Sequence, residues 1–510
     1  MKEFQTTKLI FNDLKSFEVK ELRKRIQGSS SIYDNSKISL QYLDVLANNI
    51  ELSADTAQYK LYNKLNVVAF RKLNQRLLSK MFDILSSKDI IEFNEQYDER
   101  SKEIFILEKK LMMVDLLRFR GIFSVSDGLL NQIIYSGKMY ENYEILIFAL
   151  QKKRLWLPGT NSILEKDGID KEIIKYQKYS LSLSYTKKIY TDLILMHNNS
   201  EAKNIVTAYK NGIRKVETIS KKIHSLTLNF YSSQIKAQYL SLIGRDDEAA
   251  GILIKLTEAI KNSLVFTKNR VGTILLNIAL YKRNCYKFSE AQMYLTEATK
   301  FLSRIDETKV VLYYQNAVFN FIVGDLVKSQ YFIKLLTSLD TTKLDVRLKN
   351  RIYYFFLLNL FVQGKSKEAF EHIEKIKNHF KHNVGLEIEM KILQIMISID
   401  LEQYDKVDRL LEVYRKKPVY IANLNLFPFS IKPIFILFNS LRKVGYDFNS
   451  LTKKDMNLYE KFSEDYNLKG DFLIPFTPWL KSKLKNVPYD HSAAMREMRK
   501  NYKAEKYEMA

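Results

Sequence analysis

The sequence contains few residues that interrupt a helix. Only 7 of the 510 residues are proline, and six of them lie at or after Pro418, so that Pro158 is the only proline before Arg415. Because proline removes a backbone donor and clashes with the preceding helical turn, its scarcity permits long helices over most of the chain. Only 15 residues are glycine, which is little for a protein built from tight β-turns. Both absences favour an all-α fold.

Cysteine is almost absent too. The single cysteine, Cys285, excludes an internal disulfide and a cysteine-rich metal site, and it favours a reducing compartment. Residues 1–22 carry charges throughout and lack the apolar core of a signal peptide. We therefore expect a cytoplasmic protein. Cys285 lies at a predicted turn between helices, and a reactive thiol there remains open beside a purely structural one.

No stretch of the chain has the composition of a transmembrane helix. The nearest candidate, residues 419–438, contains Lys432, two asparagines and two prolines. These residues are costly in a bilayer, and the stretch is better interpreted as a broken, buried helix. The sequence thus predicts no membrane span and a soluble protein.

The letters Gly364-Lys365-Ser366 match the end of a phosphate-binding loop, G-x-x-x-x-G-K-[ST]. Such a loop needs a glycine five positions before Gly364, where the chain has Asn359 inside the helical pattern "RIYYFFLLNLFV". Without that glycine the backbone amides cannot curl around a phosphate. We therefore predict a turn between two helices, not a nucleotide site.

The same turn recurs along the chain. Equivalent segments begin at Gly244, Tyr286, Gly324, Gly364 and Glu402. Each is followed five residues later by a small or apolar residue, at Ala249, Ala291, Ser329, Ala369 and Val407, in steps of 42, 38, 40 and 38 residues. Twelve residues before each of these stand Ala237, Ala279, Ala317, Leu357 and Ile395. Tyrosine pairs also recur forty residues apart, at 313–314 and 353–354. A fixed period near 40 predicts an array of antiparallel helix pairs, a solenoid.

Residues 227–415 resemble the tetratricopeptide repeat, with its "G-x-Y-x-x-A" turn and small residue in the first helix. The tryptophan of that family is absent, and the period exceeds its usual 34 residues. The resemblance implies that the first helices line a concave surface that binds proteins or peptides. The run "SFEVKELRKRIQGSSSIYDNSKISLQYLDVL" is similar to the N-terminus of long helical proteins from Bacteroidetes, a similarity that implies no activity.

We predict four segments. They are an N-terminal helical domain over 1–130, a helical connecting segment over 131–226, the repeat array over 227–415, and a non-repeat cap and tail over 416–510. The first two show apolar residues at intervals of three and four, and the composition shifts to clustered proline and phenylalanine from Pro418.

Three local features refine this division. We expect Gly137 in the turn of a helix-turn-helix unit, and a break in the chain around Pro158 to Glu172. The tail from Leu484 to Ala510 is expected to be at best a solvated helix.

No catalytic or metal-binding motif is found. The G-x-S-x-G, H-E-x-x-H, D-x-D-x-D-G and G-x-G-x-x-G patterns do not occur. Three of the six histidines, His372, His379 and His382, form the one cluster, and surface histidines are the favoured interpretation over a metal pair. We therefore expect no enzyme activity, no catalytic residues, no metal and no cofactor.

The net charge of +23 leaves two hypotheses for the partner. Basic stretches at residues 210–222 and 343–351 are interleaved with aromatic residues, as in proteins that bind nucleic acid, but lysine is abundant along the whole chain. The main hypothesis is a non-enzymatic scaffold that grips a protein or peptide, and the alternative is a basic, sequence-nonspecific nucleic-acid-binding repeat protein. The oligomeric state stays open. The repeat register predicts six partner-binding residues on the inner face: Tyr231, Gln234, Gln238, Tyr314, Arg351 and Tyr354.

Overall fold

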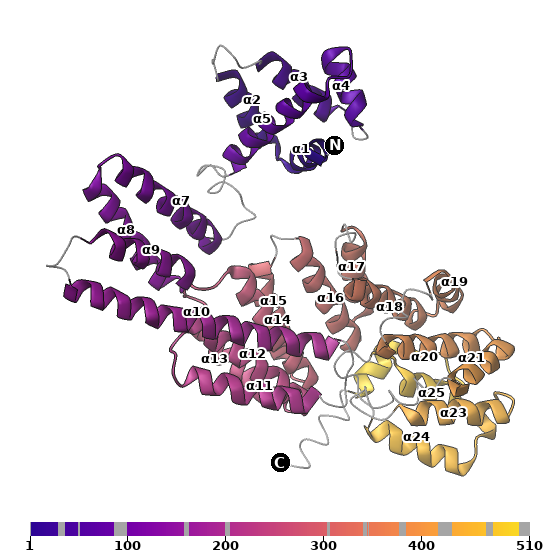
Figure 1. Cartoon of the computed structure of the whole chain (residues 1–510). Coiled ribbons are helices and arrows are strands. Elements are labelled where there is room, and N and C mark those ends of the chain that lie inside the picture. Colours follow the sequence, from indigo (N-terminus) through magenta and orange to yellow (C-terminus); the bar gives the residue numbers. More distant parts are fainter. Residues whose placement is uncertain are drawn as a thin grey trace. The chain divides into compact units, whose positions relative to one another are not determined.

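All regular structure in the described residues is helical. The computed structural model describes residues 2–28, 36–48, 52–85, 99–157, 163–198, 205–302, 306–339, 344, 346–376, 384–416, 431–465 and 473–498 (Figure 1). These residues contain no strand, which confirms the predicted all-α class. None of their helices combines the length and the apolar character needed to cross a bilayer.

The chain divides into two compact units, Met1–Leu130 and Asn131–Ala510. The division coincides with the end of the predicted N-terminal domain, while the finer division of residues 131–510 remains a prediction. The helices of the first unit are α1 (Lys2–Asp13), α2 (Ser16–Gly28), α3 (Ser36–Ala47), α4 (Ala54–Tyr62), α5 (Val67–Leu85), α7 (Glu99–Phe119) and the start of α8 (Phe123–Met139).

The core of the first unit is organised around α5. This helix buries Phe70, Leu73, Leu77 and Met81, which recur at intervals of three and four residues and so share one face. That face packs against α1 and α2. Inside this core the Tyr42 hydroxyl donates to Oδ1 of Asn74 over 2.7 Å, so that a polar pair is buried with its hydrogen bond made.

The second unit contains the rest of the helices. They are α9 (Tyr143–Trp156), α10 (Ile163–Asn198), α11 (Ile205–Ser220), α12 (Leu226–Leu242), α13 (Asp246–Ile260), α14 (Lys268–Asn284), α15 (Phe288–Leu302), α16 (Asp306–Ile322), α17 (Leu326–Thr337), α18 (Val346–Val362), α19 (Ser366–Ile376), α20 (Val384–Asp400), α21 (Tyr404–Lys416), α23 (Lys432–Lys443), η4 (Phe448–Ser450), α24 (Lys453–Asp465) and α25 (Phe476–Leu484). From α9 to α21, neighbours in sequence are mostly also neighbours in space.

The five predicted turns have one geometry. The residues at 244, 286, 324, 364 and 402 all have positive φ, between 56° and 79°. In each turn, the amide of the residue after the positive-φ residue donates to the carbonyl of the residue five positions before it, over 2.8 to 3.0 Å. This hydrogen bond is characteristic of the Schellman ending of a helix. The following helix begins two residues after the positive-φ residue. The turn predicted at Gly364 is therefore confirmed, because α18 ends just before it and α19 begins at Ser366.

The recurrent small residues pack where two helices of a pair meet. Ala249, Ala291, Ser329, Ala369 and Val407 are all fully buried. The Ser329 hydroxyl donates to the carbonyl of Ala317, twelve residues earlier, over 2.9 Å, so the two recurrent positions touch. Ser126 donates to the carbonyl of Val114 in the same way over 3.1 Å, after a turn at Gly121 with φ of 75°. The sequence analysis missed this earlier turn of the same kind.

Two local predictions in residues 131–226 were wrong. Gly137 lies inside α8, and the turn is made by Glu141, whose φ is 50°. Gly137 serves helix packing instead, because a Cβ there would lie 3.1 Å from Cβ of Leu146. Residues 163–172 of the break expected around residues 158–172 are helical, since α10 begins at Ile163, and residues 158–162 lie outside the described residues.

Glu141 caps a distant helix. Its carboxylate accepts the amides of Leu226 and Thr227 over 2.7 and 2.9 Å and the Ser225 hydroxyl over 2.8 Å. The first amides of a helix have no partner within the helix, and a carboxylate there also faces the positive end of the helix dipole. Glu141 thus ties the α8–α9 turn to the start of α12.

We expect Glu141→Ala to lower the free energy of unfolding by about 1–3 kcal/mol, because three donors lose their acceptor. Urea unfolding measures this change. Glu144→Ala is the matched control, since Glu144 is exposed in the first turn of α9 and should cost less than about 1 kcal/mol. Equal effects of the two substitutions would contradict the capping role.

The described residues after α24 pack against earlier helices of the second unit. Trp479 of α25 is fully buried, and its indole N–H donates to Oδ1 of Asp400 over 3.0 Å. Residues 491–498 are helical, and His491 is 1 % exposed. The expected solvated tail is therefore wrong for this segment, which packs against α16. Residues 419–430 of the expected broken helix lie outside the described residues.

Candidate functional site

An apolar hollow of about 260 Å³ lies where α17 meets the next helix pair, α18 and α19. Its lining consists of Ile333, Leu336, Thr337, Lys349, Ile352, Tyr353, Phe355, Phe356, Leu357 and His372. Tyr353 is 45 % exposed, so the hollow can be reached from solvent. The His372 ring meets the Phe356 ring edge-on, with centroids 5.5 Å apart. The hollow can take an apolar side chain.

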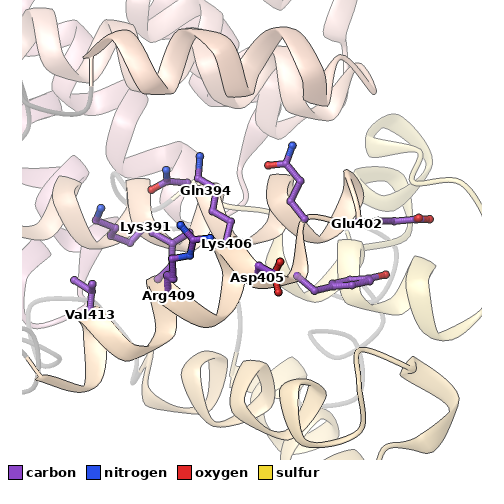
Figure 2. A pocket seen from close by; sticks show the side chains of 10 residues that line it. Lys391, Gln394, Glu402, Asp405, Lys406, Arg409 and Val413 are labelled. Carbon is purple, nitrogen blue, oxygen red and sulfur yellow. The ribbon is translucent and has the colours of Figure 1, made fainter.

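A more polar cleft of about 680 Å³ lies on the following pair, α20 and α21. It is lined by Lys391, Gln394, Glu402, Gln403, Tyr404, Asp405, Lys406, Arg409, Leu410 and Val413. In Figure 2 the side chains of Lys391, Gln394, Lys406 and Arg409 gather at one end, and Glu402 points away at the other. This arrangement separates the cations from one of the two carboxylates and favours an anionic group at the first end.

Aromatic rings pack against two of the side chains that line this cleft, Lys406 and Tyr404. The Lys406 ammonium lies 3.7 Å from the ring centroid of Phe370 on α19, a cation–π contact that fixes the lysine stem. The rings of Tyr404 and Tyr446 stack with centroids 4.5 Å apart and planes 8° apart. Arg409 is exposed and has no ion-pair partner among the described residues, so its guanidinium is available to a ligand.

The hollow and the cleft overlap in part when successive helix pairs are compared. Three lining positions of the hollow recur 38 residues later in the cleft: Tyr353 corresponds to Lys391, Phe356 to Gln394, and His372 to Leu410. The first helices of the two pairs, α18 and α20, contact each other. The repeat therefore places an apolar site beside a cationic one.

The structure does not place the nominated inner-face residues around these sites. Gln234, Tyr314 and Tyr354 are only 2 %, 6 % and 2 % exposed, so they are not available on a surface. The Tyr314 ring packs edge-on against Phe355 with centroids 5.8 Å apart. Tyr314 therefore faces the next first helix, α18. The expectation that these three residues are accessible is wrong, because all three are buried.

The other three nominated residues are half-buried. Tyr231 packs against the Tyr190 ring at 5.3 Å, and Oε1 of Gln238 accepts from the Tyr209 hydroxyl over 2.7 Å. Arg351 is the third, and none of them lines the hollow or the cleft. Tyr353 is the residue that the sequence analysis missed. The recurring tyrosine pair was the signal, but it is the first tyrosine of the pair at 353–354 that faces solvent.

The structure describes two of the four remaining candidates from the sequence, Cys285 and His372. Burial and the nearby carboxylate of Asp246 raise the pKa of the Cys285 thiol, which disfavours the reactive thiolate. His372 contributes to the apolar hollow, while His379 and His382 lie outside the described residues.

Comparisons with protein-family models, with curated proteins and with solved structures found no match.

Proposed function

We propose that the chain is a non-enzymatic scaffold whose helical repeats, a tetratricopeptide-like solenoid over residues 227–415, bind a segment of a protein or peptide partner. The observation that carries this proposal is that two successive helix pairs each have an accessible hollow or cleft, with three lining positions in common. Repeat arrays of this kind bind extended partners because each unit offers a comparable site. The five equivalent turns support the repeat arrangement, and the single cysteine supports a cytoplasmic location.

The chemistry of the two sites defines the partner. The hollow around Tyr353 suits an apolar side chain, and Lys391 and Arg409 suit a carboxylate. Packed helices lie about 8–10 Å apart, and an extended chain advances about 3.3 Å per residue. The proposed partner segment therefore carries an apolar residue and, roughly three positions away, an acidic residue.

The test is a pull-down with the tagged full chain from its native host, read by mass spectrometry with and without nuclease. Tyr353→Glu places a charge in the apolar hollow and should reduce the recovery of a genuine partner at least tenfold. Tyr331→Glu is the matched control, because Tyr331 is 59 % exposed on α17 and lines neither site. A nuclease-resistant partner retained equally by both variants would contradict the proposed site.

The second candidate function, nucleic-acid binding, rests on α11 and the residues just after it. Lys210, Arg214, Lys215, Lys221 and Lys222 are exposed there and have no ion-pair partner among the described residues. The only carboxylate of α11, Glu217, is engaged by Lys236 over 2.9 Å. In the same pull-down, this alternative predicts nuclease-sensitive material that is lost from a Lys210→Glu/Arg214→Glu variant and retained by Tyr353→Glu.

A further inference from the structure

A third surface, separate from the hollow and the cleft, lies at the C-terminal end of the first helices α16 and α18. Phe321 and Phe361 stand there at equivalent positions, forty residues apart, and both are buried. The chain's own residues 486–498 cover this surface. The Tyr489 ring stacks on Phe361 with centroids 6.5 Å apart, and the His491 ring lies 4.1 Å from the ring centroid of Phe321.

Hydrogen bonds fix the segment to the end of α16. Nε2 of His491 donates to the carbonyl of Phe321 over 2.9 Å, and the Ser492 hydroxyl donates to the carbonyl of Gly324 over 2.7 Å. Nδ1 of His491 accepts from the Tyr489 hydroxyl over 2.8 Å. The last carbonyls of a helix lack partners within the helix and carry partial negative charge. The surface therefore selects a segment that brings both an aromatic ring and hydrogen-bond donors.

Gly324 shows that this contact is specific to one turn. A Cβ at Gly324 would lie 3.1 Å from Cβ of Met495 and 3.2 Å from the carbonyl oxygen of Ser492. At the equivalent glycines Gly244 and Gly364, nothing approaches within 4 Å. Among these three glycine turns, only the one after α16 is approached so closely by another described segment.

The covering segment is held by few buried groups. Only His491 and Met495 are buried among residues 486–498, while the others are half-buried or exposed. The described part of its helix, residues 491–498, has eight residues, and an isolated helix of that length is marginal without the surface beneath it. The surface itself belongs to α16 and α18, which are held by the repeat packing. Opening of the segment alone therefore disrupts far less structure than global unfolding.

We propose that the ends of α16 and α18 form a binding surface for a short helix, and that residues 486–498 occupy it as an intramolecular ligand. The partner that fits is a helix that presents an aromatic ring, two hydrogen-bond donors and an unbranched apolar side chain within two turns. Binding of such a partner requires displacement of the chain's own segment. This surface is separate from the hollow and the cleft. A failure to find the partner segment proposed for those two sites would therefore not count against it.

Hydrogen exchange of the full chain gives the first test. Amides of residues 492–498 should exchange at least a hundredfold faster than the central amides of α16 and α18. Exchange at the same rate would mean that the segment opens only with the whole unit, and it would overturn the proposal. Gly324→Ala should accelerate this exchange more than Gly364→Ala, since both substitutions strain a positive-φ turn and only the first meets the segment.

The second test supplies the segment in trans. A labelled peptide of residues 484–498 should bind the full-length Met495→Glu chain at least tenfold more tightly than the unaltered chain, because the charged side chain releases the internal segment. Ala493→Glu is the matched chain variant, as Ala493 is exposed in the same helix, and it should behave like the unaltered chain. A peptide that itself carries Met495→Glu should not bind. Equal binding to all three chains, or no binding to a folded Met495→Glu chain, would overturn the proposal.

Discussion

Replacement of Trp479 with alanine is expected to lower the free energy of unfolding of residues 131–510 by about 3–5 kcal/mol. Trp479 is fully buried, and its ring lies within 6.4 Å of the rings of Phe438, Phe448 and Phe476. The substitution leaves a large cavity between α23 and α25. It also removes the indole donor from Asp400, which then keeps Lys483 at 2.8 Å as its remaining ion-pair partner.

The chain provides its own control, because it has only two tryptophans. Trp156 is half-buried at the end of α9, with Lys152 over its ring, and Trp156→Ala should cost less than about 1 kcal/mol. Urea unfolding followed by circular dichroism measures both changes. A loss below about 1 kcal/mol for Trp479→Ala would contradict the burial of Trp479 between α23 and α25.

Acidification from pH 7 to pH 4 is expected to remove up to about 3 kcal/mol of stability through His491 alone. Burial of its imidazole lowers the pKa of His491 from 6.5 to about 4, against the weaker opposing effects of the Phe321 carbonyl and the Asp490 carboxylate. Both ring nitrogens are already engaged, one by the Phe321 carbonyl and the other by the Tyr489 hydroxyl. An additional proton has no acceptor in this site unless the Tyr489 hydroxyl reorients.

The direction follows from proton binding in the two states. Between pH 6.5 and about 4, the unfolded chain binds a proton on His491 that the folded chain excludes, so stability falls as the pH falls through this window. His491→Gln keeps a donor and an acceptor but does not titrate there. We expect the difference in free energy of unfolding, that of the unaltered chain minus that of His491→Gln, to fall as the pH is lowered from 7 to 4. A constant difference across that window would contradict the burial of a neutral His491.

The repeat could be predicted because each turn is determined locally. A glycine that tolerates positive φ, a two-residue link and a small residue at the helix crossing occur within about six positions, so their spacing is visible in the sequence. Tyr286 and Glu402 adopt positive φ without being glycine, yet the period of about 40 still located their turns. The turn at Gly121 escaped because it lies outside the stretch in which the period was counted.

The candidate sites could not be predicted from the same pattern. Tyr353 and Tyr354 are adjacent and chemically identical, but one is 45 % exposed and the other 2 %. Successive residues on a helix point about 100° apart, so the choice between them depends on where α17 and α20 pack. Likewise, nothing local to residues 486–498 indicates that α16 supplies the carbonyls for His491 and Ser492.

The sequence by itself determined the helical class, the positions of the turns and the small residues that let paired helices approach. These features depend on backbone conformation and on neighbours within one helix pair. Tertiary structure alone decided which side chains remain at the surface, where the hollow and the cleft lie, and that residues 486–498 cover the ends of α16 and α18. Those outcomes depend on contacts between residues that are up to 170 positions apart, such as His491 and Phe321, and chain-local patterns do not encode such pairings.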